Sequence, residues 1–223
     1  MKKILCMVTM LVCAFFLVGC DKTNNGLEFK NDYESMNGKV NASGVAHRKV
    51  TIDENNPFVF STTKEILSKI NKNETFYVYF GDKQCPWCRS VIEKAIEVAN
   101  KYNIKKIYYI NIWDDNHNEI LRDVYNLDEN NKPVLKSEGT SDYKYLLEKF
   151  ENVLDDYELS TEDGDTVKVG EKRIYAPNFI YIEKGKPVEK IAGYSNNQTN
   201  SREELTSELL KDEEKIFTEF FNR

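Results

Sequence analysis

The sequence of 223 residues has few cysteines, few histidines and no excess of basic side chains. Its five cysteines do not form the several spaced pairs that hold a small disulfide-stapled scaffold together, which excludes that class of protein. A formal net charge of −6 argues against a nucleic-acid-binding protein, because such proteins present a basic face to phosphates. No internal repeat is present. The length suits one folded domain with a tail.

The first twenty residues have the pattern of an export signal. Lys2 and Lys3 precede an apolar stretch over residues 4–18, which is too short to span a bilayer comfortably. The stretch ends in Leu17-Val18-Gly19-Cys20, which resembles the lipobox of bacterial lipoprotein precursors. The resemblance implies that residues 1–19 are removed and that Cys20 carries lipid. A plain secretory signal and an uncleaved anchor are the alternatives.

A lipidated Cys20 predicts a protein held on the extracytoplasmic face of the cell membrane. More than one acyl chain is needed for durable anchoring, and lipoprotein modification supplies them. Residues 20–50 are polar, with few large apolar side chains, so we expect a lipidated N-terminus followed by a flexible tether. His47, at the end of this tether, is expected to be solvated. Residues 51–223 are expected to form the folded domain.

Apolar patterning predicts a βαβ unit at the start of this domain. The runs 75–80 and 106–112 are nearly continuous aromatic and β-branched segments, which is typical of strands buried on both faces. Between them, residues 85–101 carry apolar side chains at helical spacing. The two strands are therefore expected to be parallel. A short strand at 58–60 and a helix capped by Thr62 and Glu65 precede the unit.

The second half of the domain is predicted to end in a ββα arrangement. Helices are expected over roughly 116–126 and 142–156, followed by a turn at Asp163-Gly164. A strand at 178–182 returns through a hairpin loop to a strand at 188–192, and Ser201 and Glu204 cap a closing helix. The sequence therefore predicts an α/β fold with a central mixed sheet flanked by helices. A helical insert, about 114–172, separates its βαβ and ββα halves.

The sequence Cys85-Pro86-Trp87-Cys88 lies where a predicted strand leads into a helix. The first turn of a helix has unpaired N–H groups and the positive end of the helix dipole, which stabilise a thiolate at Cys85 and lower its pKa. Pro86 suits the first turn, where its missing N–H has no partner to lose. Cys88 lies one turn later on the same face, where it can attack a mixed disulfide formed at Cys85.

Two other interpretations of the cysteine pair compete with redox chemistry. A zinc site needs two further ligands, and His47 and His117 are distant in the sequence, so we expect no metal. A purely structural disulfide closes a very small loop here and stabilises little. The redox interpretation is favoured, and Trp87 is expected to be partly exposed as a contact surface for substrate. No cofactor is expected.

The segment from Phe76 to Gly81 followed by the Cys-Pro-Trp-Cys sequence resembles the active site of the thioredoxin superfamily. The resemblance covers roughly residues 55–222 and implies a thioredoxin-like fold. It further implies that Pro177 is a cis-proline touching the cysteine pair, and that the backbone of Ala176 pairs with substrate peptide. A trans-proline entering an edge strand is the alternative for Pro177.

Within that superfamily, the sequence is most similar to the thioredoxin-like proteins called bacteriocin transport accessory proteins. The similarity rests on the Cys-Pro-aromatic-Cys motif, the enlarged middle segment and the stretch from Glu171 to Pro177. The sequence also departs from thioredoxin. Tyr79 occupies the position of thioredoxin's buried aspartate, so proton transfer is expected to use water or another acid such as Asp82 or Glu74. The insert is expected to cap the active site or to add a packing layer.

Three functions are compatible with these observations. The first is a thiol–disulfide oxidoreductase acting through Cys85 and Cys88 on thiols and disulfides of exported proteins. The second is a dedicated accessory to peptide export, or to a membrane redox relay with a membrane-bound redox partner. The third is a non-catalytic binding lipoprotein on a thioredoxin scaffold. The direction of electron flow is not encoded in the two residues between the cysteines.

Overall fold

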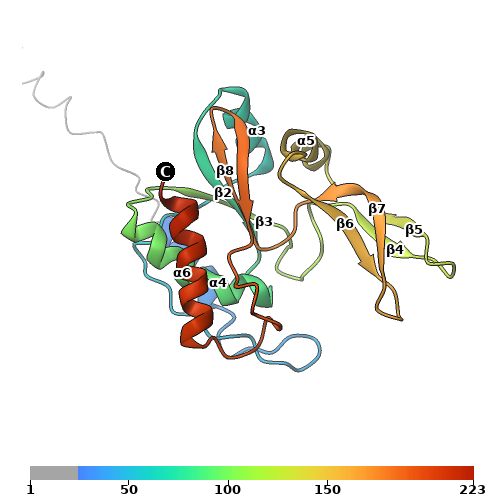
Figure 1. The fold of residues 1–223 in the computed structure, drawn as a ribbon, viewed down its shortest axis with the longest axis horizontal. Helices are drawn as coiled ribbons and strands as arrows, with labels where there is room; N and C mark the ends of the chain where they lie inside the picture. Colours follow the sequence, from blue (N-terminus) through green and yellow to red (C-terminus); the bar gives the residue numbers. More distant parts are fainter. Residues whose placement is uncertain (1–24) are drawn as a thin grey trace, which may run out of the picture.

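The computed structural model describes residues 25–223, and a five-stranded sheet lies at its centre (Figure 1). The strand order across this sheet is β1-β3-β2-β8-β9. Strands β1, β3 and β2 are parallel, whereas β8 is antiparallel to both β2 and β9. The strands are β1 (Phe58–Phe60), β2 (Phe76–Gly81), β3 (Ile107–Asn111), β8 (Asn178–Glu183) and β9 (Lys186–Ile191).

Helices cover both faces of the sheet, so the domain has three layers. One face packs against α2, α4 and α6, and the other packs against α3 and α5. Because successive side chains of a strand point to opposite faces, Tyr79 of β2 enters the first core and its neighbour Phe80 enters the second. The helices are α2 (Asn25–Glu34), α3 (Thr63–Asn71), α4 (Pro86–Lys101), α5 (Ser141–Phe150) and α6 (Ser207–Phe221).

This arrangement confirms the predicted central mixed sheet flanked by helices and the predicted βαβ unit. The near-continuous apolar runs of β2 and β3 reflect burial on both faces of the sheet. Thr62 caps α3 as expected, since its side chain accepts a hydrogen bond from the N–H of Glu65 at 3.2 Å.

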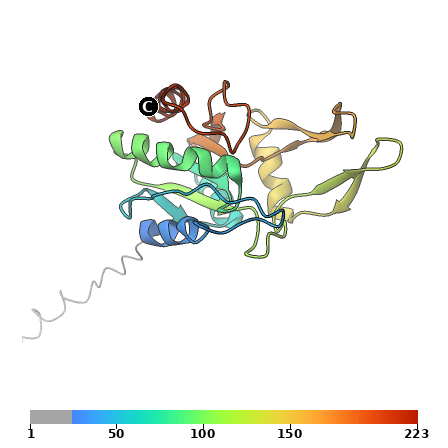
Figure 2. The same ribbon diagram turned by 90° about the horizontal axis from the view of Figure 1, so that it is seen from below.

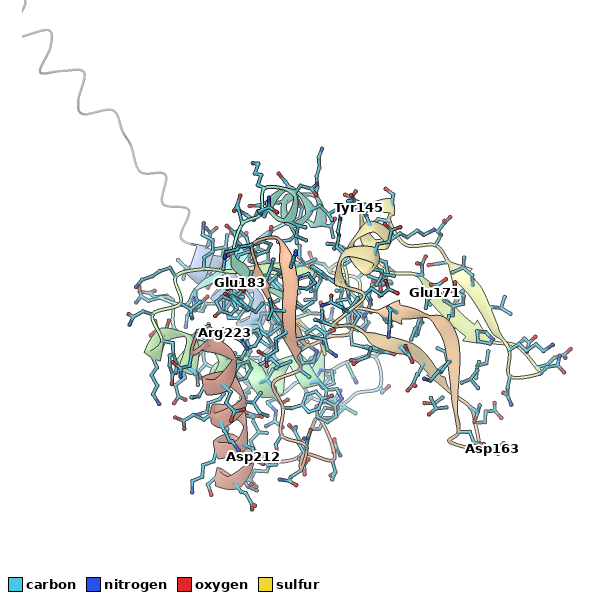
Figure 3. The ribbon with its side chains drawn as sticks, turned by 45° about the horizontal axis from the view of Figure 1, so that its top comes forward. Tyr145, Asp163, Glu171, Glu183, Asp212 and Arg223 are labelled. Carbon is cyan, nitrogen blue, oxygen red and sulfur yellow. The ribbon has the colours of Figure 1, made fainter. Side chains whose placement is uncertain are left out.

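The insert between the two halves is not a helical cap, which corrects the prediction for residues 114–172. It consists of α5 between two hairpins, which project from the body of the domain (Figure 2). The turn at Asp163 forms the tip of the second hairpin (Figure 3). The hairpin strands are β4 (Val124–Leu127) and β5 (Pro133–Ser137) in the first, and β6 (Asp155–Ser160) and β7 (Thr166–Arg173) in the second.

The helix predicted over residues 116–126 is absent because local polar contacts favour a turn. The Asp114 carboxylate accepts hydrogen bonds from the N–H groups of Asn116 and Asn118 at 2.9 and 2.8 Å. His117 has a φ of 62°, in the left-handed region that interrupts a helix. Ile120 is exposed, so the apolar residues do not form the single buried stripe that a helix here requires.

Two predicted helices have different boundaries in the structure. The helix predicted over 142–156 ends at Phe150, and β6 begins at Asp155. The closing helix begins after Thr206, whose side chain accepts the N–H of Leu209, rather than at the predicted capping box of Ser201 and Glu204. Thr206 offers the same hydroxyl cap five residues later, which the spacing of apolar residues alone did not distinguish.

The predicted flexible tether is wrong for residues 25–50, which pack on the domain. Phe29 and Tyr33 of α2 are one helical turn apart and fully buried, and Phe29 stacks on Phe58 with ring centroids 4.3 Å apart. Gly26 permits this approach, because a Cβ there would lie 2.3 Å from the Glu54 carbonyl oxygen. His47, expected to be solvated, is buried as well.

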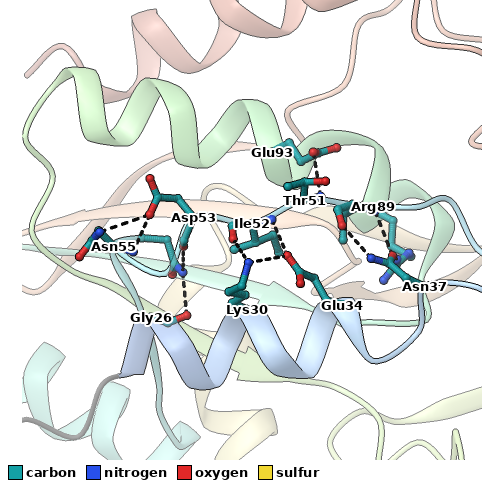
Figure 4. A network of polar contacts seen from close by, with 12 residues as sticks. Gly26, Lys30, Glu34, Asn37, Thr51, Ile52, Asp53, Asn55, Arg89 and Glu93 are labelled. Carbon is teal, nitrogen blue, oxygen red and sulfur yellow. Dashed lines mark hydrogen bonds and ion pairs between the residues drawn. The ribbon is translucent and has the colours of Figure 1, made fainter.

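Polar contacts fasten this N-terminal segment to α4 (Figure 4). The Asn37 side chain donates to the Val50 carbonyl and accepts the Val50 N–H, at 2.8 and 3.0 Å. The buried Arg89 guanidinium of α4 donates to the Tyr33 and Arg48 carbonyl oxygens and to the Asn37 side chain, at 2.8, 2.7 and 2.7 Å. A few large apolar side chains and these backbone contacts therefore order a segment of polar composition.

The predicted signal, the predicted lipidation site Cys20 and the start of the predicted tether lie outside the described residues. Within residues 25–223, no helix combines the length and the apolar character needed to cross a bilayer.

One buried carboxyl group makes the stability of this domain dependent on pH. Glu213 of α6 is fully buried and neither carboxylate oxygen has a hydrogen-bond partner among the described residues. Burial raises the pKa of Glu213 to about 7, although Lys94 and Arg48 oppose the shift. The folded state therefore retains a proton that the unfolded chain releases at lower pH.

We predict that Phe29→Ala destabilises the domain by about 3–5 kcal/mol, because it leaves a cavity between α2 and β1. Denaturant-induced unfolding of the full chain measures the change. The control is Tyr145→Ala on the exposed side of α5, for which a change below about 1 kcal/mol is expected. Equal effects of the two substitutions would show that α2 contributes no core packing.

We predict that stability falls by about 3 kcal/mol as the pH rises from about 4.5 to about 7, owing to Glu213 alone. The penalty is complete above the folded-state pKa, where the buried carboxylate is ionised. Glu213→Gln removes this part of the pH dependence, so the variant gains stability relative to the parent at pH 8 but not at pH 4. Unfolding at both pH values measures it, with Glu214→Gln as control; a pH-independent difference between variant and parent contradicts the prediction.

Candidate active site

Cys85 and Cys88 lie at the start of α4, as the sequence predicts. Strand β2 ends at Gly81, a short loop follows, and Cys85 occupies the position before the first helical residue, Pro86. The N–H of Cys88 donates to the Cys85 Sγ at 3.3 Å, so the sulfur itself caps the helix. Both cysteines are free thiols and both are buried, with 6 % of Cys85 and none of Cys88 exposed.

The Ala176–Pro177 segment lies against this helix start. The peptide bond between these residues is cis, so the alternative of a trans-proline is wrong. The Cys85 thiol donates to the Ala176 carbonyl oxygen at a sulfur–oxygen distance of 3.6 Å. The structure therefore brings the pair Cys85 and Cys88 together with the pair Ala176 and Pro177, although more than eighty residues separate the two pairs in sequence.

The two thiols have opposite acidities. A hydrogen bond from the Cys88 thiol, together with the N–H groups of Cys88 and Trp87, holds the pKa of Cys85 below its usual value despite burial. Burial and the adjacent Cys85 raise the pKa of Cys88 well above its usual value. Of the two thiols, Cys85 is therefore the one that loses its proton more readily, and Cys88 the one that retains it.

Of the two acids expected to replace thioredoxin's aspartate, only Asp82 lies near the cysteines. Its Oδ1 accepts the N–H groups of Gln84 and Cys85 at 2.7 and 3.2 Å, while its Oδ2 is buried without a partner. Burial raises the pKa of Asp82, and its charge opposes ionisation of Cys85. Glu74 instead pairs with Lys69 at the far end of β2, so it is not part of the site.

Tyr79 lies beneath the cysteine pair and its side chain is fully buried. Its hydroxyl interacts with the Cys88 thiol and lies 2.9 Å from the hydroxyl of Tyr33. Tyr33 is not among the residues that the sequence predicted for the site, because residues 25–50 were expected to be a tether. The sequence feature that indicates a buried helix here is the spacing of Phe29 and Tyr33, two aromatic residues one helical turn apart in a polar segment.

A cavity of about 720 Å³ opens beside the cysteine pair. Trp87 is partly exposed in its wall, and its ring packs on Tyr194 with centroids 4.5 Å apart. The β6–β7 hairpin forms another part of the wall. The lining residues beyond Trp87 and Tyr194 are Leu154, Asp155, Asp156, Glu158, Lys172, Tyr175, Ala176, Pro177, Asn178, Lys190 and Ala192. The expectation that the insert lies beside the active site is met, but by a hairpin rather than by helices.

A second cavity, of about 400 Å³, lies on the other side of Cys85. Both histidines, His47 and His117, line it together with Trp113 and Arg202. Burial lowers the pKa of His47, with Arg89 and Arg202 adding to the effect. Within residues 25–223, no group of three or more His, Cys, Asp and Glu side chains is arranged to hold a metal ion.

We predict that Asp82→Asn lowers the pKa of Cys85, because the variant keeps the acceptor oxygen of Asp82 but removes its charge. The alkylation rate of Cys85 measured against pH reports this, and the rate below neutral pH is expected to rise several-fold. Asp115→Asn is the control, since Asp115 is exposed and pairs with Lys83. A profile that is unchanged in Asp82→Asn rules out the electrostatic coupling.

The described residues thus join four sequence-predicted positions, Cys85, Cys88, Ala176 and Pro177, with Trp87 at the edge of the same cavity. The proposed lipidation site, Cys20, lies outside the described residues. Neither a scan against protein-family models nor a search of curated proteins found a match to this chain. The geometry of the cysteine pair and the mixed α/β architecture therefore carry the functional argument.

Proposed function

We propose that the chain has a thioredoxin-like fold and is a thiol–disulfide oxidoreductase that acts through Cys85 and Cys88. The observation that carries the proposal is the position of the Cys85 sulfur. It lies between the first-turn N–H groups of α4 and the Ala176 carbonyl, beside the cis Ala176–Pro177 peptide. A cysteine pair that forms a purely structural disulfide requires neither a lowered pKa at one of its sulfurs, as at Cys85, nor a cavity beside the pair.

The chemistry follows from the order of acidities. In the reducing direction, the Cys85 thiolate attacks a substrate disulfide, forms a mixed disulfide and releases the first substrate thiol. Cys88 then attacks the Cys85 sulfur, the second substrate thiol leaves, and the Cys85–Cys88 disulfide remains. The oxidising direction runs through the same steps in reverse, with substrate as the electron donor.

The substrate in this proposal is a disulfide or thiol in an extended segment of an exported protein. Such a segment fits the cavity beside Trp87, whose stacking on Tyr194 offers an apolar surface next to Cys85. The resemblance to thioredoxin implies backbone pairing at Ala176. The exposed carboxylate of Glu158 and the paired Asp155 and Lys190 give the opposite wall a polar character.

The proposed location is the extracytoplasmic face of the cell membrane, through lipid on Cys20 after removal of residues 1–19. A disulfide-exchange protein belongs in such a compartment, because thiols are not kept reduced there. Net reduction of substrates requires electrons from a membrane-bound redox partner, since the chain has one dithiol among its described residues.

A second candidate, a dedicated accessory to peptide export, is favoured by one observation. The β6–β7 hairpin projects beside the cysteine pair and forms part of the cavity wall, which is the position of an element that selects one partner. A non-catalytic binding role is less well supported, because it gives no reason for the lowered pKa of Cys85.

We predict that the protein catalyses insulin reduction in the presence of a dithiol, or disulfide formation in a reduced model protein. Cys85→Ser is expected to lose all activity above background. Cys88→Ser is expected to form stable mixed disulfides without turnover, because the resolving thiol is gone. The reduction potential of the Cys85–Cys88 couple, expected between roughly −270 and −120 mV, decides the direction.

Activity that persists in Cys85→Ser would contradict the proposal. The partners trapped by Cys88→Ser distinguish the two candidates. A broad set of exported proteins supports the general oxidoreductase, whereas one recurrent partner supports the dedicated accessory.

A further inference from the structure

Three buried tyrosines lie beneath the cysteine pair, one each from α2, β2 and β3. Tyr33, Tyr79 and Tyr109 are all fully buried. The rings of Tyr79 and Tyr109 stack with centroids 5.5 Å apart, and the Tyr33 ring contacts Tyr109 edge-on at 6.1 Å. A phenol hydroxyl in an apolar core is costly unless it forms a hydrogen bond, so the partners of these three groups are informative.

Two of the three hydroxyls are hydrogen-bonded to each other, and one of the two residues, Tyr79, shares a buried core with Cys88. The Tyr33 and Tyr79 oxygens are 2.9 Å apart, and the Tyr79 hydroxyl interacts with the Cys88 sulfur. A phenol has one proton to donate. When Tyr79 donates to the sulfur, it therefore accepts from Tyr33, and each hydrogen bond in such a chain strengthens the next. The Tyr109 hydroxyl, by contrast, is buried without a hydrogen-bond partner among the described residues.

The position of the Tyr79 hydroxyl is defined sterically by its surroundings. A Cβ on Gly81 would lie 2.3 Å from the Cζ and Oη atoms of Tyr79, so only glycine fits at this place. On its other side, the Tyr79 ring stacks on Phe179 with centroids 4.3 Å apart. The hydroxyl is thus held at the end of β2, directly below the loop that leads to the cysteines.

We propose that Tyr79 is a catalytic residue that stabilises the Cys88 thiolate when Cys88 attacks the mixed disulfide, and that Tyr33 positions Tyr79. This inference rests on the proposed oxidoreductase function and adds to it the group that serves Cys88. A hydrogen-bond donor thereby takes the place of a proton-accepting carboxylate. The role belongs to the second half-reaction, because only then does Cys88 lose its proton.

The step balances without any further reagent. The Cys88 sulfur attacks the Cys85 sulfur, a Cys85–Cys88 bond forms, and the bond between Cys85 and the substrate sulfur breaks. The electron pair of the broken bond goes to the substrate sulfur, which takes up the proton that Cys88 has lost. Tyr79 keeps its own proton and donates a hydrogen bond to the Cys88 sulfur while that sulfur carries negative charge.

Other charged or titratable groups also face Cys88, and each acts differently. Cys85 lies beside it on α4, and its charge is removed in the mixed disulfide. Arg89 of α4 interacts electrostatically with Cys88 but donates its hydrogen bonds to backbone carbonyls and to Asn37. Asp82 interacts with the Cys88 thiol through its backbone N–H, which favours the thiolate form of Cys88. Among these groups, Tyr79 therefore offers a neutral hydroxyl in the same buried core as Cys88, where it interacts with the Cys88 thiol.

The test uses the reduced protein with Cys6, Cys13 and Cys20 replaced by serine, so that Cys85 and Cys88 are its two thiols, and a chromogenic aromatic disulfide, dithiobis-nitrobenzoate. The first coloured thiol is released when Cys85 attacks the reagent, and the second is released when Cys88 resolves the mixed disulfide. The variants are Tyr79→Phe, Tyr33→Phe and the matched control Tyr109→Phe. Each removes one buried hydroxyl from the same cluster and keeps the ring that packs.

In Tyr79→Phe, we expect the second release to slow about threefold or more at pH 7, while the first stays within about twofold of the parent. The loss of the hydrogen bond lowers the thiolate population of Cys88, and the greater nucleophilicity of a more basic thiolate offsets part of that loss. The pH–rate profile of the second release moves to higher pH. Tyr33→Phe shows the same displacement to a smaller extent, and Tyr109→Phe stays within about twofold in both phases.

An unchanged second release in Tyr79→Phe overturns the inference, as does an equal slowing in Tyr109→Phe, which would indicate general damage to the core. If Tyr79→Phe does not fold, an unmoved pH–rate profile in Tyr33→Phe overturns it as well. If the proposed oxidoreductase function itself is wrong, the result differs from these outcomes. The parent protein then shows no fast release of the first coloured thiol and no turnover of insulin.

Discussion

The hydrogen bond from the first turn of α4 to the Cys85 sulfur is the interaction on which the site depends. It uses an N–H group that every helix start leaves without a partner. Cys88 supplies this N–H as well as the second thiol. The same helical turn therefore caps α4 with the Cys85 sulfur and lowers the pKa of Cys85. On the other side of the Cys85 sulfur lies the carbonyl oxygen of Ala176, in the connection between β7 and β8. The sheet aligns both, because β2 leads into α4 and pairs with β8, which follows Pro177.

The N-terminal segment gives this arrangement a second layer of support. Helix α2 covers the face of the sheet from which Tyr79 projects, and Arg89 of α4 donates to the carbonyl oxygens of Tyr33 within α2 and of Arg48 after it. Any disturbance of α2 therefore reaches the helix that carries the cysteines. This coupling links a segment outside the expected domain, residues 25–50, to Tyr79 beneath the cysteine pair through the hydroxyl of Tyr33.

The parts of the molecule that the sequence predicted well are those with a strong local pattern. The strands β2 and β3 and the helix between them follow from continuous apolar runs and helical spacing, and the helix start follows from Cys85-Pro86. The region after Trp113 was not predictable in this way, since Asp114 and a left-handed His117 turn the chain where apolar spacing suggested a helix. Helix α2 was missed because two aromatic residues, Phe29 and Tyr33, carry its packing within a polar composition. Tertiary partners on β1 and β3 decide that case, and composition does not contain them.

The ordered start of α2 has a consequence for the proposed lipid anchor at Cys20. Asn25 already belongs to a helix that is part of the folded body, so five peptide steps separate it from Cys20. Even fully extended, they cover only about 18 Å. Under the proposed lipidation of Cys20, the folded body would rest close to the lipid headgroups, and substrates of the proposed oxidoreductase would meet it near the membrane surface.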